Sequence, residues 1–251
     1  MNNKYLPLSD VQRSYFYGRS KGTFLGGIST HFYIECMTSL DKDKLEKALN
    51  SVIKEQPSLR SYITSDGMQC CMDEAPEYYR IKETDISRLS YEEQEKKLLE
   101  IRKRCSNRIF DLDSWPMFEF NICITGRDKN VMIIDSDMMI MDGLSTEILI
   151  ESLYKYYEKD EPVREISIEA FEDHIALKEQ KKAENYDNDK AFWKEIIEEL
   201  PSGPHFERTG GNEERTFDTR EISVPADKWG AKSRELKSER ILPVSYTHLR
   251  A

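Results

Sequence analysis

The 251-residue sequence lacks several features that define common functional classes. No apolar run approaches the roughly 20 residues that a membrane-spanning helix needs, and the N-terminal stretch has no hydrophobic signal segment. An excess of positive charge is also missing, because the net charge is -10 and binding to nucleic acid requires a basic face. We therefore expect a cytoplasmic protein that binds neither nucleic acid nor a membrane.

Cysteine and histidine are too few and too scattered to predict a metal centre. The cysteines lack the paired C-x-x-C spacing of a zinc site, and no histidine lies near the motif described below in sequence. We expect no metal and no directly bound cofactor, and nothing local to that motif suggests a histidine general base. The residues concerned are Cys36, Cys70, Cys71, Cys105, Cys123, His31, His174, His205 and His248.

What is present describes a globular protein, with 38% hydrophobic and 33% charged residues. The length allows one large domain or two small ones with a substantial core.

The most informative stretch is Asp137-Met-Met-Ile-Met-Asp142-Gly143-Leu-Ser145. It places two carboxylates and a hydroxyl at the end of a very apolar strand, where an ionised carboxylate needs a cationic partner or a hydrogen-bond donor. One interpretation is structural, with Asp142-Gly143 as a turn and Ser145 as a helix N-cap. The other is that these side chains belong to a reactive site.

Five segments resemble the ordered motifs of one family, the heterocyclization domains of nonribosomal peptide synthetases, which are relatives of condensation domains. The stretch 137–145 resembles their Asp-x-x-x-x-Asp-x-x-Ser core, and condensation domains carry His-His-x-x-x-Asp-Gly there. Asp137 and Met138 stand where that histidine pair would be. The other four segments are Tyr5 to Arg19, Pro57 to Gln69, Phe110 to Ile122 and Phe192 to Pro204.

Two departures from the family pattern occur in the second motif. Gln56 replaces a histidine and Ser58 a methionine, whereas Arg60 is kept.

The resemblance implies an α/β fold like chloramphenicol acetyltransferase, in which each lobe has a mixed sheet packed with helices. A tunnel between the two lobes would admit the phosphopantetheine arms of upstream and downstream peptidyl carrier proteins, and an adenylation domain would belong to the same synthetase. The implied reaction joins an acyl thioester to carrier-bound cysteine, serine or threonine and then cyclodehydrates the product to a thiazoline or oxazoline.

The implied site residues are Asp137, Asp142 and Ser145 as catalytic candidates, with Arg60 and Gly143 as structural support. We predict that Asp142 pairs with Arg60, that a second donor holds Asp137, and that Ser145 caps the following helix. The family residues thought to drive cyclodehydration lie in the second lobe.

The predicted organisation is an N-terminal lobe over 1–204, the beginning of an incomplete C-terminal lobe over 205–242, and a tail over 243–251. That tail looks like translated sequencing-adapter DNA, and we expect it to be absent from the natural protein. The chain is then an inactive half of a larger enzyme.

Two other classes stay open. An ordinary condensation or acyltransferase domain would form only the amide or ester, but it normally needs the second histidine, which Met138 replaces. A degenerate half-domain could instead dock a carrier protein without chemistry.

Hydrophobic periodicity predicts most of the local structure. Helices are expected from Ser9 to Gly18 and from Asp41 to before Pro57, with a charged, largely solvated one over Tyr91–Ser106. Further helices are expected over Thr146–Tyr157, over Ser167–Leu200 as one or two pieces broken at 185–189, and from Pro225 onward. Strands are expected over Ser29–Met37, Leu59–Ile63, Met68–Cys71 and Phe217–Val224, with a hairpin joining 118–122 to 131–136.

Overall fold

The computed structural model describes residues 3–19, 26–159, 161–203 and 223–239. It separates into two compact units, Met1–Tyr186 and Asp187–Ala251. The first unit contains two β-sheets and their covering helices, and all the site residues named above lie in it. The suspected tail at 243–251 and most of the strand expected over 217–224 lie outside the described residues.

The larger sheet has four strands in the order β2-β7-β6-β5. Strands β2 (His31–Thr38), β7 (Asn130–Asp137) and β6 (Phe118–Ile124) pair antiparallel, and β5 (Lys82–Asp85) pairs parallel to β6. The predicted hairpin is confirmed. Its turn contains Gly126 at φ +69°, where a Cβ would lie only 3.0 Å from Ser87, so a larger residue is disfavoured.

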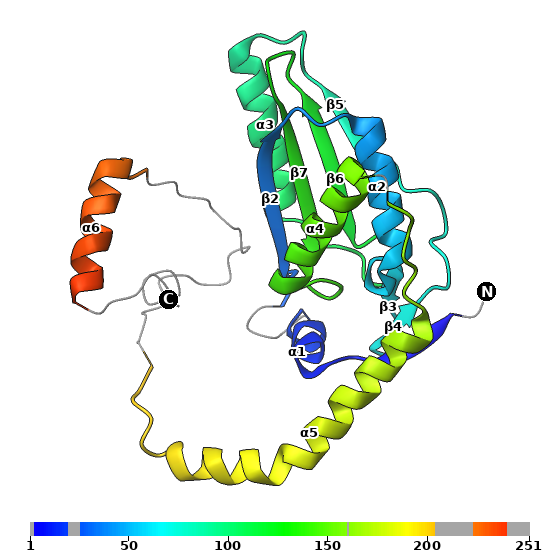
Figure 1. Ribbon diagram of the computed structural model, residues 1–251, viewed down its shortest axis with the longest axis vertical. Helices are drawn as coiled ribbons and strands as arrows, with labels where there is room; N and C mark the ends of the chain where they lie inside the picture. The colour runs from blue at the N-terminus through cyan, green and yellow to red at the C-terminus, as the bar shows by residue number, and fades with distance from the viewer. Residues whose placement is uncertain (1–2, 20–25, 160, 204–222, 240–251) are drawn as a thin grey trace. The chain divides into compact units, whose positions relative to one another are not determined.

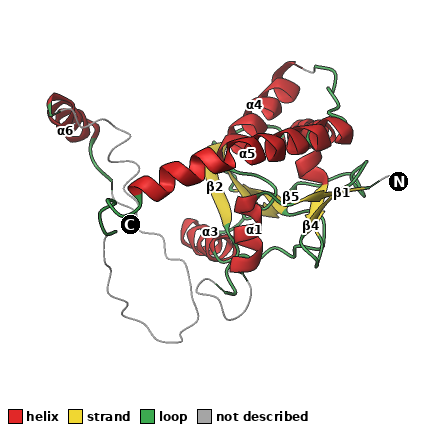
Figure 2. Ribbon diagram, turned by 90° about the horizontal axis from the view of Figure 1, so that it is seen from below, coloured by secondary structure: helices red, strands yellow, loops and turns green. Residues whose placement is uncertain are grey.

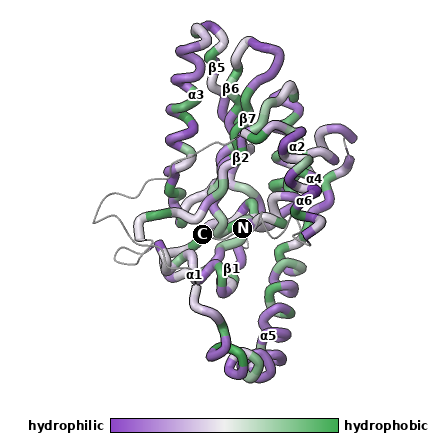
Figure 3. The backbone as a smooth tube through the Cα atoms, turned by 90° about the vertical axis from the view of Figure 1, so that its left-hand side faces the viewer, coloured by the Kyte–Doolittle hydropathy of each residue, from purple (hydrophilic) through white to green (hydrophobic). Residues whose placement is uncertain are grey.

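Two layers of helices cover this sheet, as Figure 1 shows. Helix α3 (Tyr91–Ser106) lies against one face, and α2 (Lys42–Glu55) and α4 (Gly143–Lys159) cover the other. Alternation along β7 divides its side chains between the layers: Met132 and Ile134 pack in the larger core with α2 and α4, whereas Val131 and Ile133 pack under α3. Hydrophobic stretches of the tube in Figure 3 include the region of β6 and β7.

A second sheet has three strands in the order β1-β4-β3. Strand β4 (Met68–Cys71) pairs antiparallel with both β1 (Lys4–Pro7) and β3 (Ser61–Ile63). A 3₁₀ turn, η1 (Pro57–Arg60), occupies the first part of the strand that we expected over 59–63. Strands β1 and β5, of four residues each, were not predicted.

All the predicted helices are present, and some of their ends differ from the predicted ones. Helix α1 (Asp10–Gly18) has Ser9 as its N-cap in a capping box with Gln12. Helix α5 (Ile168–Ile196) runs through the polar 185–189 segment without a break, and α6 (Ala226–Ser238) begins just after Pro225. Among the described residues, no helix is both long and apolar enough to cross a membrane.

The helical spacing of Ile150, Leu153, Tyr154 and Tyr157 predicts that these four residues share the buried side of α4, and this prediction is only partly correct. The buried side of α4 is formed by Leu149, Leu153 and Tyr156, while Ile150 and Tyr154 are exposed. The α3 surface is largely solvated, as predicted, but Arg102 and Arg104 near its C-terminal end, and Arg108 in the segment after it, pair with carboxylates of the sheet. These ion pairs are Arg102–Glu35, Arg104–Glu119 and Arg108–Glu119.

Candidate functional site

Asp137 is the last residue of β7, and its side chain is completely buried. Nη2 of Arg19 donates to both carboxylate oxygens, at 2.8 Å to Oδ1 and 2.6 Å to Oδ2. The Ser29 hydroxyl donates to Oδ2 at 2.6 Å, and the Met139 N–H donates to Oδ1 at 2.9 Å. The predicted second donor therefore exists, and it is Arg19, at the end of α1.

Arg19 comes from the first motif and Asp137 from the core motif, 118 residues apart. Helix α1 lies at the end of the sheet where β2 and β7 meet the site (Figures 1 and 2). The Nε and Nη1 atoms of Arg19 are buried without a hydrogen-bond partner in the part of the chain that the structure describes. The ion pair is therefore buried, and within the described residues only one of the three Arg19 side-chain nitrogens has a hydrogen bond. A buried ion pair of this kind fixes the positions of its two side chains more than it adds to the free energy of unfolding.

Asp142 lies outside this buried cluster and precedes α4. Its Oδ1 accepts from the Ser145 N–H at 2.8 Å and from the Ser145 hydroxyl at 2.7 Å. Asp142 is thus the N-cap of α4, and the prediction that Ser145 is the cap is wrong. The Ser145 N–H, followed by its hydroxyl, lowers the pKa of Asp142 below its usual value.

Arg60 does not pair with Asp142, and that prediction is wrong. Its guanidinium donates to four main-chain carbonyls: Met72 O at 2.9 Å, Ile53 O at 3.2 Å, Lys54 O at 2.7 Å and Ile166 O at 3.3 Å. Burial lowers the pKa of Arg60. Arg60 therefore joins the C-terminal end of α2, the end of β4 and the segment before α5.

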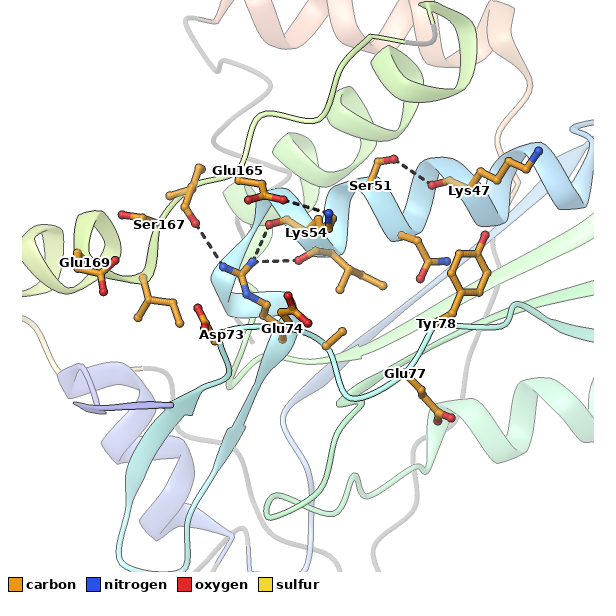
Figure 4. A pocket seen from close by; sticks show the side chains of 16 residues that line it. Lys47, Ser51, Lys54, Asp73, Glu74, Glu77, Tyr78, Glu165, Ser167 and Glu169 are labelled. Carbon is orange, nitrogen blue, oxygen red and sulfur yellow. Dashed lines mark hydrogen bonds and ion pairs between the residues drawn. The ribbon is translucent and has the colours of Figure 1, made fainter. Parts of the chain in front are cut away.

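The Arg60 side chain lines a half-open groove of about 970 Å³. Figure 4 shows Lys54 and Glu165 facing each other there, 3.1 Å apart, with Asp73 and Glu74 on the loop after β4. The structure thus separates the predicted site residues into three places: Asp137 beside Arg19, Asp142 with Gly143 and Ser145 at the start of α4, and Arg60 in this groove.

Gly143 is the first residue of α4, and nothing in the described lobe requires a glycine there. A Cβ at this position would meet no atom within 4 Å, and its φ is not in the left-handed region. Among the described residues, no group of three or more His, Cys, Asp or Glu side chains is arranged to hold a metal ion.

A further buried group, which no sequence pattern indicated, lies next to Asp137. Asp135 faces the same side of β7, and its side chain is fully buried. Arg108 Nε lies 3.0 Å from Oδ2, but neither oxygen has a well-aligned hydrogen bond within the described ranges. Burial raises the pKa of Asp135 to about 6, against the opposing effects of Arg108 and His31.

Asp135→Asn should change how stability depends on pH. Because the folded-state pKa is raised, the stabilising contribution of Asp135 is present in acid and is lost as the pH rises through about 6. The free energy of unfolding of the variant, minus that of the parent, should be about 2 kcal/mol larger near pH 7 than near pH 4.5. Urea unfolding of both proteins at several pH values measures this difference.

Asp142→Asn supplies a control of opposite sign. The pKa of Asp142 is lowered, so its stabilising contribution is present at neutral pH and is lost in acid. The same slope for both variants would contradict the assignment of Asp135 as a carboxylate whose charge is disfavoured by burial.

The fold defines an α/β lobe of the kind found in chloramphenicol-acetyltransferase-like enzymes, with a mixed sheet between helical layers. The family model "Condensation domain" matches residues 2–240. The chain belongs to the condensation-domain family.

Relatives include bacitracin synthase 1 of Bacillus licheniformis, which is 27% identical over 205 residues. Phenyloxazoline synthase MbtB of Mycobacterium bovis is 26% identical over 218 residues. These alignments cover 80% and 85% of this chain but only 4% and 15% of the two relatives, so the chain corresponds to a small part of each.

A solved structure of the EpoB NRPS cyclization-docking bidomain from Sorangium cellulosum is also similar. Its TM-score is 0.75 at 26% identity, and the match covers 96% of this chain and 48% of that one.

Proposed function

We propose that this chain is the N-terminal lobe of a heterocyclization domain in a nonribosomal peptide synthetase. The core motif carries the proposal: Asp137, held by Arg19 and Ser29, replaces the first histidine of the condensation motif, and Met138 replaces the second. A methionine thioether cannot take a proton from an attacking amine, so the histidine-dependent route is closed here. The names of two relatives, a phenyloxazoline synthase and a cyclization bidomain, support the same reaction.

The proposed reaction has two stages. The amine of carrier-bound cysteine, serine or threonine attacks the carbonyl carbon of the upstream thioester, a C–N bond forms, and the phosphopantetheine thiol leaves with a proton. The side-chain sulfur or oxygen then adds to the new amide carbonyl. The former amide carbonyl oxygen is then lost as water, and a C=N bond remains in a thiazoline or oxazoline ring.

The role of the lobe in this reaction is to position groups. The amide-forming stage starts from an activated thioester, so holding the amine close to it lowers the barrier substantially. Water loss needs an acid, and Asp142 is poorly suited because its lowered pKa keeps it ionised. Asp137 is already engaged by Arg19, Ser29 and the Met139 N–H and is therefore held in place rather than free to face a substrate. We therefore assign Asp137, Asp142 and Ser145 to shaping the site, and we place the acid outside these three residues.

The partners follow from the same proposal. Upstream and downstream peptidyl carrier proteins would present their phosphopantetheine arms, and an adenylation domain of the same synthetase would load the amino acid. An ordinary condensation domain is the second candidate, and the match to the family model "Condensation domain" is compatible with it. A carrier-docking half-domain without chemistry is the third.

The product mass distinguishes these candidates. The synthetase that contains this chain is supplied with a carrier-bound acyl donor and carrier-bound cysteine, serine or threonine, and the products are released and weighed. A product lighter than the linear amide by one water supports heterocyclization. Carrier-bound alanine is the matched control, because it can form the amide but has no side-chain nucleophile. Amide without the second water loss supports the condensation candidate, and carrier binding without product supports the docking candidate.

A further inference from the structure

His31 lies directly opposite Asp137 in the sheet. It begins β2, the register pairs it with Asp137 on β7, and its side chain is almost fully buried on the face covered by α3. Residues paired across antiparallel strands point to the same face. The two side chains therefore share one end of the sheet, although they are separated by about a hundred residues of sequence.

Both ring nitrogens of His31 face main-chain carbonyl oxygens. Nδ1 lies 3.2 Å from Ser29 O, and Nε2 lies 2.8 Å from Cys105 O. A carbonyl oxygen only accepts hydrogen bonds, and a neutral imidazole carries hydrogen on one nitrogen only. Both contacts are hydrogen bonds only when the ring is protonated on both nitrogens.

The surroundings of the ring stabilise a positive charge. Cys105 belongs to the last turn of α3, where the helix dipole favours a cation. Asp135 Oδ1 lies 3.9 Å from Nε2, and both Asp135 oxygens lack hydrogen bonds within the described residues. The other charged or titratable groups around Asp135 and the ring, from the two neighbouring strands, α3 and the segment after it, are Tyr33, Glu119, Arg104, Cys105, Arg108 and Asp137.

A short chain of contacts connects the ring to Asp137. His31 bonds the main chain of Ser29, and the Ser29 hydroxyl donates to Asp137 Oδ2 at 2.6 Å. On its other side, Asp137 accepts the Met139 N–H at 2.9 Å. We propose that His31 is a positioning residue for Asp137: as an imidazolium it joins Ser29 to the end of α3 and so keeps the Ser29 hydroxyl on the carboxylate. This inference does not depend on the reaction proposed above.

The first test uses the unmodified chain. Nitrogen-15 NMR of the histidine rings distinguishes a nitrogen that carries hydrogen from one that does not. The expected result near pH 6.5 is hydrogen on both ring nitrogens of His31, assigned by comparison with His31→Gln. A bare nitrogen in the ring would overturn the imidazolium assignment.

The second test follows the Met139 amide, whose exchange with solvent hydrogen reports the position of Asp137. Its rate is divided by that of Ile134, in the middle of β7, to remove changes in global stability. His31→Phe should raise this ratio about tenfold, and Ser29→Ala should do the same. If His31 acts through Ser29, the double variant should show no further increase over Ser29→Ala.

Tyr33→Phe is the matched control, because Tyr33 lies on the same face of β2 but donates to Glu35 at 2.5 Å, away from Asp137. It should leave the ratio unchanged. His31→Gln, which keeps one N–H for Cys105 O, should give a smaller increase than His31→Phe, and it serves if the phenylalanine variant does not fold. An unchanged ratio in the histidine variants, or fully additive effects with Ser29→Ala, would overturn the positioning role.

Discussion

Arg19→Met should lower the free energy of unfolding of this chain by about 3 to 5 kcal/mol. The Asp137 side chain has no exposed surface, and Arg19 Nη2 supplies the cationic contact to both of its oxygens. Without that contact the carboxylate is a buried charge that, among the described residues, is held only by the Ser29 hydroxyl and the Met139 N–H. Urea unfolding at neutral pH, monitored by tryptophan fluorescence, measures the loss.

The double variant separates the cost of an unpaired charge from the loss of packing. Asp137→Asn alone should also destabilise, because it leaves the Arg19 guanidinium buried with two of its nitrogens already unpartnered in the described lobe. Arg19→Met combined with Asp137→Asn should recover about half of the summed loss, since neither charge is then left alone.

The matched control is Arg13→Met on the same helix. Arg13 pairs with Asp10 at the surface, where solvent screens the pair, so Arg13→Met should destabilise the chain far less than Arg19→Met. If Arg19→Met were as mild as Arg13→Met, the Arg19 contact would not be what stabilises the buried Asp137 side chain, contrary to the geometry.

Local signals explain which elements the sequence predicted well. Helix α3 begins and ends as predicted because Ser90 forms a capping box with Glu93 and basic residues fill the last turn. The β6–β7 hairpin was equally easy to predict, since its two apolar strands are adjacent in sequence and Gly126 marks the turn. Such features depend on residues close together in sequence, so one segment contains the whole pattern.

The side-chain contacts that form the site join residues far apart in sequence, so no single segment of the sequence could predict them. The sequence places a carboxylate at Asp137 but does not say whether Arg19 or Arg60 approaches it, because both arginines belong to matching motifs. It also gives no reason to bring His31 beside Asp137, since that contact follows from the β2–β7 register. In α4, the pattern allowed two helical phases, and packing against α2 selected Leu149, Leu153 and Tyr156 for the buried face.

Arg60→Ala should be the other strongly destabilising substitution, lowering the free energy of unfolding by about 3 to 5 kcal/mol. The guanidinium bonds the carbonyls of Ile53 and Lys54 at the end of α2, and two further carbonyls from β4 and the segment before α5. Truncation to alanine leaves these mostly buried carbonyl oxygens without their hydrogen-bond donor. The C-terminal end of α2 also loses a cation that the helix dipole favours.

Arg60→Lys should recover little of this loss, because a single ammonium group cannot reach the four acceptors that surround the planar guanidinium.

Lys54→Met is the matched control in the same groove. Lys54 and Glu165 are both about two-thirds exposed, so their ion pair should contribute less than about 1 kcal/mol. Limited proteolysis within 161–167 gives a local readout, since Arg60 bonds Ile166 O and cleavage there should be faster in both Arg60 variants. Full stability in Arg60→Lys would mean that charge alone, rather than the four directed hydrogen bonds, holds α2, β4 and the start of α5 together.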